Sequence, residues 1–236
     1  VISDESAFIV YDGAPLQSRT TYFWQVKGWD EDGVESDWSE TASWHVGILS
    51  EEEWKGRWIG APWQGNDSYD IMDPDRKTQY IVEDTEFDAE PAPLIRKQFT
   101  IAKPVKEVRF YGTGLGYFEL YVNGKRIGDE YFSPNQTNYD VRPNLVGTER
   151  GITDPFEEYL VMYLTYDLTD VVFEGENVFG VILGNGFYDV VKHWSPMGYG
   201  SPRFMGQVEI EYQDGTVETI GSDETWKIER SAIVKD

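Results

Sequence analysis

The chain lacks cysteine altogether and has only two histidines, His45 and His193. Without cysteine, it has neither a disulfide framework nor a thiol nucleophile. Two histidines are too few for a histidine metal cluster and leave little material for a Ser-His-Asp triad. His45 alternates within a strand pattern, which favours a structural role. Carboxylates are plentiful, but no spacing selects an acid–base pair for glycoside hydrolysis. We therefore assign no catalytic residue from the sequence.

Basic residues are scarce. Twenty lysines and arginines stand against 43 acidic residues, and the net charge is −23. Such a chain cannot neutralise a row of phosphates or bind an anionic membrane surface, so we predict no nucleic-acid or membrane partner. No run of about 18 apolar residues is present. The first residues, Val1 to Asp4, have neither the basic nor the apolar part of a signal peptide, and the chain reads as an excerpt from a longer protein.

Long Ala/Leu/Glu/Lys windows typical of helices are also missing, whereas aromatic residues are abundant, with 12 Phe, 15 Tyr and 9 Trp. This balance favours strands. We predict an all-β protein in which an incomplete fibronectin type III-like sandwich precedes a jelly-roll-type antiparallel β-sandwich. The expected domains are residues 1–49 and 94–236. Residues 50–93 form a linker and a long surface loop.

The first domain rests on an alternating strand from Thr21 to Trp29, a turn at Asp30–Gly33 and a returning strand at Ala42–Val46. The spacing of its tyrosine, tryptophan, glycine and serine residues is similar to the last strands of a fibronectin type III domain. A complete sandwich of this kind needs about seven strands. Only about four are recognisable here, so we expect the domain to be incomplete or to lean on a neighbour.

In the second domain, eight short strands are separated by turn residues, as in a jelly-roll sandwich. A helical turn is expected at 169–175, capped by Thr169 and ended by Gly175. Residues 141–159 read as an insertion that is either plain decoration or part of a binding rim. The expected strands are 94–101, 105–111, 116–122, 160–168, 177–183, 204–212, 217–220 and 225–228.

The strand that begins at Tyr117 contains the first candidate binding residues. Its even positions are apolar and belong in the core, whereas Tyr117, Glu119 and Tyr121 face solvent or a neighbouring domain. A row of aromatic rings and polar groups suits a carbohydrate, because rings cover the apolar face of a sugar and polar groups bind its hydroxyls. The strand ends in Asn123-Gly124, which is typical of a type I′ hairpin turn.

A second strand, apolar on both faces, ends in Gly184-Asn185-Gly186. The glycines allow a steep turn that exposes backbone carbonyls. Ca²⁺ takes oxygen ligands from asparagine and from carbonyls, so Asn123 and Asn185 are candidate ligands of one ion. Purely structural turns are the alternative for both. Tyr188 and Trp194 follow in a Gly/Pro-rich segment, where aromatic residues are harder to explain as core, and we include both among the candidate ligand-binding residues.

Several motifs in a fixed order resemble the N-terminal region of bacterial α-L-rhamnosidases whose catalytic domain is an (α/α)₆ barrel. The resemblance covers nearly the whole chain, and in that family a fibronectin-like domain precedes the domain with these motifs. The motifs are Trp58-Ile59, Arg96-Lys97-x-Phe99, Gly114-Leu115-Gly116-Tyr117-x-Glu119-Leu120-Tyr121-x-Asn123-Gly124, Gly128-Asp129, Pro134-x-x-Thr137-x-Tyr139, Tyr166-Asp167-Leu168-Thr169, Gly175-x-Asn177, Leu183-Gly184-Asn185-Gly186-Phe187-Tyr188, Pro202-Arg203 and Asp223-Glu224-Thr225-Trp226-Lys227.

The resemblance implies that the catalytic glutamates lie in the barrel, beyond Asp236, and that this chain alone is inactive. It also implies L-rhamnose-containing glycans and the chain's own barrel as partners. Some relatives bind L-rhamnose through Ca²⁺, which implies that Asn123 and Asn185 are ion ligands. Val122 stands where that site has an acidic neighbour. A periplasmic or extracellular location is favoured.

Two alternative functions stay open beside a non-catalytic portion that braces the barrel. One is an autonomous Ca²⁺-dependent carbohydrate-binding module, which would depend on the two asparagines and on exposed aromatic residues. The other is a β-sandwich adhesion or assembly protein with no sugar site. The sequence does not decide which glycan is bound.

Overall fold

The computed structural model describes residues 2–4, 10–64, 91–137, 139, 160–188 and 200–233. The chain divides into two compact units, Val1–Trp54 and Lys55–Asp236. The division falls inside the 50–93 segment that the sequence identifies as linker and loop. Helical structure in the described residues is limited to two short 3-10 helices, Glu51–Glu53 and Pro62–Gln64, and neither is long or apolar enough to cross a membrane.

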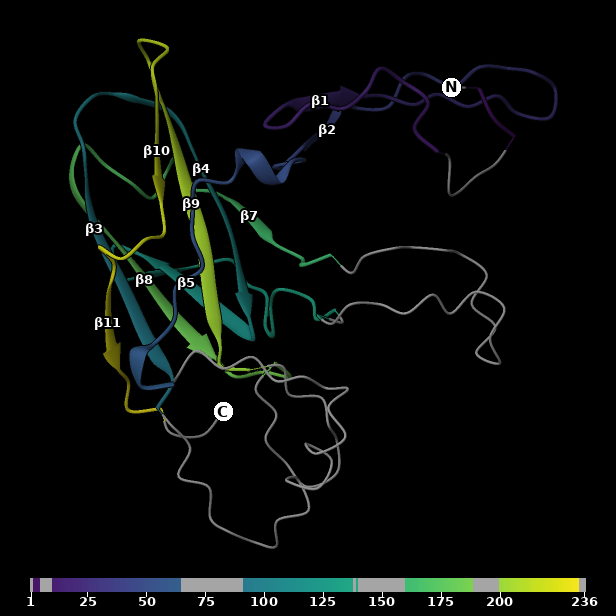
Figure 1. The fold of residues 1–236 in the computed structure, drawn as a ribbon. Helices are drawn as coiled ribbons and strands as arrows, with labels where there is room; N and C mark the ends of the chain where they lie inside the picture. Colours follow the sequence, from purple (N-terminus) through teal and green to yellow (C-terminus); the bar gives the residue numbers. More distant parts are fainter. Residues whose placement is uncertain are drawn as a thin grey trace, which may run out of the picture. The chain divides into compact units, whose positions relative to one another are not determined.

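Unit 1 contains a two-stranded antiparallel sheet of β1 (Thr21–Trp24) and β2 (Ala42–His45) (Figure 1). The predicted turn after Trp29 is present. The Asp30 carboxylate accepts hydrogen bonds from the backbone N–H groups of Asp32 and Val34, at 3.0 and 2.8 Å. Gly33 adopts a φ of +78°, which glycine allows without steric cost. The described residues of unit 1 thus contain two strands of the four or so that the sequence indicated, and the incompleteness of the sandwich stays a prediction.

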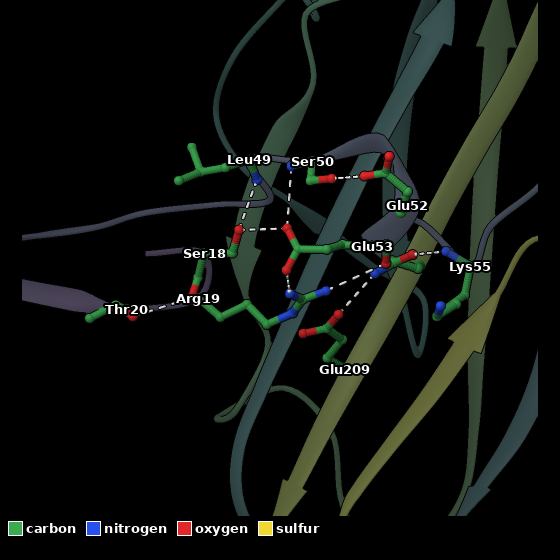
Figure 2. A network of polar contacts seen from close by, with 10 residues as sticks. Ser18, Arg19, Thr20, Leu49, Ser50, Glu52, Glu53, Lys55 and Glu209 are labelled. Carbon is green, nitrogen blue, oxygen red and sulfur yellow. Dashed lines mark hydrogen bonds and ion pairs between the residues drawn. The ribbon is translucent and has the colours of Figure 1, made fainter. Parts of the chain in front are cut away.

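A polar network lies at the C-terminal end of unit 1 and is shown in Figure 2. Ser18 donates a hydrogen bond from its hydroxyl to the Glu53 carboxylate at 2.6 Å, and Arg19 forms an ion pair with the same carboxylate. The backbone N–H of Ser50 reaches it at 3.2 Å, and the Leu49 N–H donates to the Ser18 hydroxyl. These contacts, with the Ser18 hydrogen bond as the largest cause, lower the pKa of Glu53. The Glu53 carboxylate therefore links Ser18 and Arg19 to the C-terminal end of the unit.

Unit 2 consists of two antiparallel sheets (Figure 1). One sheet has four strands in the order β10-β9-β4-β7, and the other has five in the order β11-β3-β8-β5-β6. The strands are β3 (Pro93–Ile101), β4 (Val105–Leu115), β5 (Tyr117–Val122), β6 (Lys125–Ile127), β7 (Leu164–Asp167), β8 (Gly175–Gly184), β9 (Arg203–Tyr212), β10 (Val217–Gly221) and β11 (Lys227–Arg230).

The core lies between the two sheets, because buried and more exposed side chains alternate along strands such as β3, β5 and β8. Along β5, Phe118, Leu120 and Val122 are buried while the residues between them are half exposed. Phe179 of β8 stacks on Phe99 with ring centroids 4.3 Å apart, and both belong to the same cluster as Phe204 of the opposite sheet. Burying one such side chain contributes about 1.5–3 kcal/mol. This confirms the all-β, antiparallel class, whereas jelly-roll connectivity stays a prediction.

Every strand expected in unit 2 is found, with bounds that shift by a few residues. The strand expected from 160 begins only at Leu164. The short β6 was not expected; it pairs with β5 as the second arm of the Asn123-Gly124 hairpin. The expected helical turn after Leu168 is a single turn, in which the Val171 N–H donates to the Leu168 carbonyl.

Its predicted cap is wrong. A cap at Thr169 would accept from the N–H groups of Val171 or Val172, but both donate to the Leu168 carbonyl. The Thr169 hydroxyl instead accepts a hydrogen bond from the Val108 N–H of β4, and the backbone N–H of Thr169 donates to the Asp167 carboxylate at 3.0 Å. The short acidic side chain reaches the N–H two residues on, as in an Asx turn. The proposed insertion at 141–159 lies outside the described residues.

Candidate functional site

An aromatic surface lies where β5 begins and β8 ends. We define it by Tyr117, Phe132, Tyr139, Phe187 and Tyr188, which surround the turn at Asn185. The antiparallel register pairs Tyr117 with Gly184, so the turn that follows β8 lies beside the first residue of β5. The sequence therefore places two of its own motifs side by side at one end of the five-stranded sheet.

Two glycines allow this close approach. Gly116 has a φ of +108°, and a Cβ there would lie 2.3 Å from the Gly184 carbonyl oxygen. Gly186 has a φ of +51°, and a Cβ there would lie 2.8 Å from the Tyr117 ring. An L side chain meets both a steric clash and an unfavourable backbone conformation at either position. The turn closes with a hydrogen bond from the Tyr188 N–H to the Asn185 carbonyl at 3.2 Å.

The rings pack edge to face. Tyr117 and Phe132 are 5.7 Å apart between centroids, and Tyr139 and Tyr188 are 5.2 Å apart. Burial raises the pKa of Tyr139, so its hydroxyl stays protonated. Phe132 and Phe187 are 78% and 49% exposed. Packed rings with exposed neighbours form an apolar platform of the kind that covers one face of a sugar.

Of the predicted ligand-binding residues, Tyr117 and Tyr188 belong to this aromatic surface. Trp194 lies outside the described residues. Phe132 and Tyr139 were not selected from the sequence, although Tyr139 stands in the Pro134-x-x-Thr137-x-Tyr139 motif. The alternation that identifies a strand face does not extend to residues outside strands, so no periodic signal marked these two rings.

Glu119 and Tyr121 lie further along β5 and face outward, as predicted. Their polar groups are joined to each other and to β6. The Tyr121 hydroxyl donates to the Glu119 carboxylate at 2.8 Å, and this hydrogen bond raises the pKa of Tyr121. Arg126 lies 3.3 Å from the same carboxylate and stacks 4.9 Å from the centre of the Tyr131 ring. A ligand at this position must compete with these contacts.

Asn123 and Asn185 do not lie together, so the hypothesis that they share one ion is wrong. Asn123 follows the end of β5 and pairs with Val178 near the beginning of β8, whereas Asn185 follows the end of β8. Val178 and Asn185 are seven residues apart along the strand, and at about 3.4 Å per residue this separates the two asparagines by about 24 Å. The two strands are antiparallel, and this direction alone places their C-terminal turns at opposite ends.

The side chain of Asn123 is occupied by structural hydrogen bonds. Its Oδ1 accepts from the Val178 N–H at 3.0 Å, and its Nδ2 donates to the Asn177 side chain at 2.9 Å and to the Val171 carbonyl at 3.2 Å. Its φ of +51° and that of Gly124, +80°, are those of the I′ hairpin turn.

Clusters of acidic, histidine or cysteine side chains are one feature that marks a metal site. In the described part of the chain, no group of three or more histidine, cysteine, aspartate or glutamate side chains is arranged to hold a metal ion. Asn123 and Asn185 do not fit one shared Ca²⁺ for the reason of register given above. Asn185, in a half-buried turn, stays a predicted ligand on its own.

The antiparallel sheets define the class of protein, an all-β protein whose second unit has two sheets packed around one core. Residues 103–236 match the family described as the alpha-L-rhamnosidase N-terminal domain. Residues 1–50 match the Rha78A-like, N-terminal immunoglobulin domain, where the sequence resembles fibronectin type III; both are β-sandwiches. The chain belongs to the family of alpha-L-rhamnosidase N-terminal domains.

Similar proteins are all much longer than this chain. An alpha-L-rhamnosidase of Formosa agariphila is 32% identical over 99% of this chain, which spans 23% of that relative. One from Alteromonas sp. strain LOR is 30% identical, and the chain spans 22% of it. The chain thus spans less than a quarter of the length of these curated relatives.

Solved structures agree with the fold. The alpha-L-rhamnosidase of Dictyoglumus thermophilum has 35% identity and a TM-score of 0.69, over 93% of this chain and 22% of that one. The Streptomyces avermitilis enzyme, complexed with L-rhamnose, has a TM-score of 0.73 at 21% identity, over 99% of this chain and 36% of that one. The second likeness is one of fold alone.

Proposed function

We propose that this chain is the non-catalytic β-sandwich portion of a glycoside hydrolase resembling α-L-rhamnosidase, that it braces the catalytic barrel, and that its aromatic surface binds L-rhamnose-containing glycans. The observation that carries the proposal is the family membership of residues 103–236 in a chain that spans less than a quarter of the Formosa agariphila and Alteromonas relatives. The activity on terminal α-L-rhamnosides then belongs to the remainder of the protein. A periplasmic or extracellular location fits an enzyme that meets glycans outside the cell.

The chemistry of the aromatic surface supports the sugar-binding part. L-Rhamnose has a methyl group and a ring face made of C–H bonds, and these pack on tyrosine and phenylalanine rings. The tyrosine hydroxyls and the carbonyls of the Asn185 turn supply hydrogen-bond partners for the sugar hydroxyls. The net charge of −23 is compatible with a neutral ligand.

The test is a calorimetric titration of the chain with L-rhamnose, in Ca²⁺ and in EDTA. Sugar binding is expected to weaken strongly in Tyr188→Ala and in Asn185→Ala. The matched control is Phe173→Ala, since Phe173 is 56% exposed and lies outside the aromatic surface. Loss of binding in EDTA assigns a Ca²⁺ ion to the site. Unchanged affinity in Asn185→Ala contradicts the assignment of that turn.

A scaffold without a sugar site is the second candidate. It is favoured by the contacts among Glu119, Tyr121 and Arg126, because these polar groups already have partners within the chain. Absence of rhamnose binding in both buffers supports this candidate and leaves recognition of the sugar to the remainder of the enzyme.

A further inference from the structure

The edge of the five-stranded sheet contains a small cationic hollow, far along the sequence from the aromatic surface. It has a volume of about 130 Å³ and is lined by Arg96, Lys97, Gln98, Thr225 and Lys227. Arg96 and Lys97 belong to one of the sequence motifs and Lys227 ends another, and the proposed function uses neither. Pairing of β11 with β3 brings the two motifs together.

The register of β11 and β3 places two positive charges opposite each other, because Lys227 pairs directly with Arg96. Residues opposite each other on neighbouring strands share a face, and like charges there destabilise the sheet. Neither side chain has an ion pair or a hydrogen bond to a side chain within the part of the chain that the structure describes. Lys97 completes the group; its ammonium donates to the Thr225 hydroxyl.

The chain has more than twice as many acidic as basic residues. Several basic side chains elsewhere in the described structure are joined to a carboxylate of the chain itself. Examples are Arg19 with Glu53, Lys27 with Glu35, Lys103 with Asp214, Lys106 with Glu211, Arg109 with Asp167 and Arg126 with Glu119.

Two carboxylates lie near the hollow without neutralising the opposed pair. The Asp223 carboxylate accepts hydrogen bonds from the hydroxyl and the backbone N–H of Thr225, which lower its pKa most, and the nearby charge of Lys97 lowers it further. Glu229 lies two residues beyond Lys227 on β11, opposite Leu94. Neither is within ion-pair distance of Arg96 or Lys227, so these two charges have no carboxylate partner in the part of the chain that the structure describes.

We propose that this hollow binds a single oxyanion, the carboxylate or the sulfate group of an acidic glycan. A volume of about 130 Å³ is smaller than a pocket for a whole drug-sized ligand and suits one charged substituent. The planar guanidinium of Arg96 matches an oxyanion with two parallel hydrogen bonds, and Lys227 adds a point charge. The proposal rests on the proposed glycan-binding function for the nature of the ligand, but the binding chemistry is independent of the aromatic surface.

The first experiment measures thermal unfolding of the chain as chloride is replaced by sulfate at constant ionic strength. Sulfate stabilises most proteins to some degree by exclusion from their surface. Lys125→Glu, which makes the same change of charge on β6, therefore serves as control. We expect Lys227→Glu to raise the unfolding temperature in chloride, because it replaces repulsion from Arg96 with attraction, and to reduce the extra stabilisation by sulfate. A sulfate effect equal in the two variants overturns the proposal.

The second experiment titrates the chain with inorganic sulfate, glucuronate and glucose by calorimetry. Binding of sulfate or glucuronate, without glucose binding, supports the site and tells a sulfate ester from a sugar carboxylate. Arg96→Thr is expected to weaken this binding about tenfold, since one charge-assisted contact is lost. If neither anion binds, the proposal is wrong. L-Rhamnose binding and its loss in Tyr188→Ala are measured separately, so failure here leaves the proposed function testable.

Discussion

Asn123 combines a backbone role and a side-chain role at one position. Its left-handed backbone conformation turns the chain from β5 into β6, and its amide holds the hairpin to the beginning of β8. Its partner Asn177 is fully buried, and both ends of its amide also have hydrogen bonds to the segment around Phe173. The two asparagines thus supply donors and acceptors to backbone groups of the 171–173 segment that lack strand partners.

We predict that Asn123→Ala lowers the free energy of unfolding of unit 2 by about 2–4 kcal/mol. The substitution removes three hydrogen bonds, including those of the partly buried Val178 N–H and Val171 carbonyl, and it places an alanine at a positive φ. Asn123→Gly is the matched control, because it loses the same hydrogen bonds without the backbone cost and is expected to be about 1 kcal/mol milder. Urea unfolding monitored by circular dichroism measures both. Equal stability of the Asn123→Ala variant and the original chain contradicts this account.

Glu53 makes unit 1 sensitive to acid. Its pKa is lowered in the folded chain relative to the ordinary value of 4.5. The carboxylate therefore stabilises the fold above that value, and the contribution is lost as the pH falls below it. Hydrogen exchange of the backbone N–H groups in residues 18–53, measured between neutral pH and pH values below 4.5, is expected to show this loss. Glu53→Gln, which cannot titrate, should change less over the same range; an identical pH profile would rule out Glu53 as the cause.

At the scale of elements, the pairing of β5 with β8 decides the position of the aromatic surface. Gly116 and Gly184 let the backbone at the end of β8 lie against the beginning of β5, and the Asn185 turn follows directly. A wider separation would draw Tyr188 away from Tyr117. The site therefore depends on backbone contact more than on the side chains that form its surface.

We expect Gly116→Ala to destabilise unit 2 by about 3 kcal/mol or more, since the new Cβ would lie 2.3 Å from a backbone oxygen. Gly215→Ala is the control. Its φ of +80° is similarly unfavourable for alanine, but the space around it is open, so it should cost about 1 kcal/mol. Thermal unfolding of the two variants separates the steric term from the conformational one. A similar loss in both would show that the close approach at Gly116 has no energetic effect.

At the scale of the whole molecule, the charge is the dominant property. A net charge of −23 in 236 residues disfavours polyanionic partners over most of the surface. The hollow at Arg96 and Lys227 is a local exception to it. A ligand that is neutral along its length and acidic at one substituent is compatible with both features.

The purified chain is expected to release no product from an aryl α-L-rhamnoside. The reason is that the chain spans less than a quarter of the Formosa agariphila and Alteromonas relatives, and no carboxylate pair with the spacing of a glycosidase stands out in its sequence. A colorimetric assay at several pH values measures this, with a full-length α-L-rhamnosidase as positive control. Turnover that copurifies with the chain would overturn the assignment as a non-catalytic portion.

Local patterns determined most of the fold. Alternation of apolar and polar residues located every strand of unit 2 except β6, which has three residues and is too short for a periodic signal. The same alternation correctly assigned Phe118, Leu120 and Val122 to the core and Tyr117, Glu119 and Tyr121 to the outer face. These predictions succeed because side chains of a strand point to opposite faces with a period of two, whatever the partner strand is.

Only the tertiary structure decided which residues meet. Pairing joins residues distant in the sequence, and no periodicity encodes its direction or register. Antiparallel pairing of β5 with β8 separated Asn123 from Asn185, although both follow strands in similar motifs. Pairing of β11 with β3 brought Lys227 beside Arg96. The sequence by itself determined the strands and their faces, because these depend on neighbouring residues; the sites depend on contacts across the sheets, which exist only after folding.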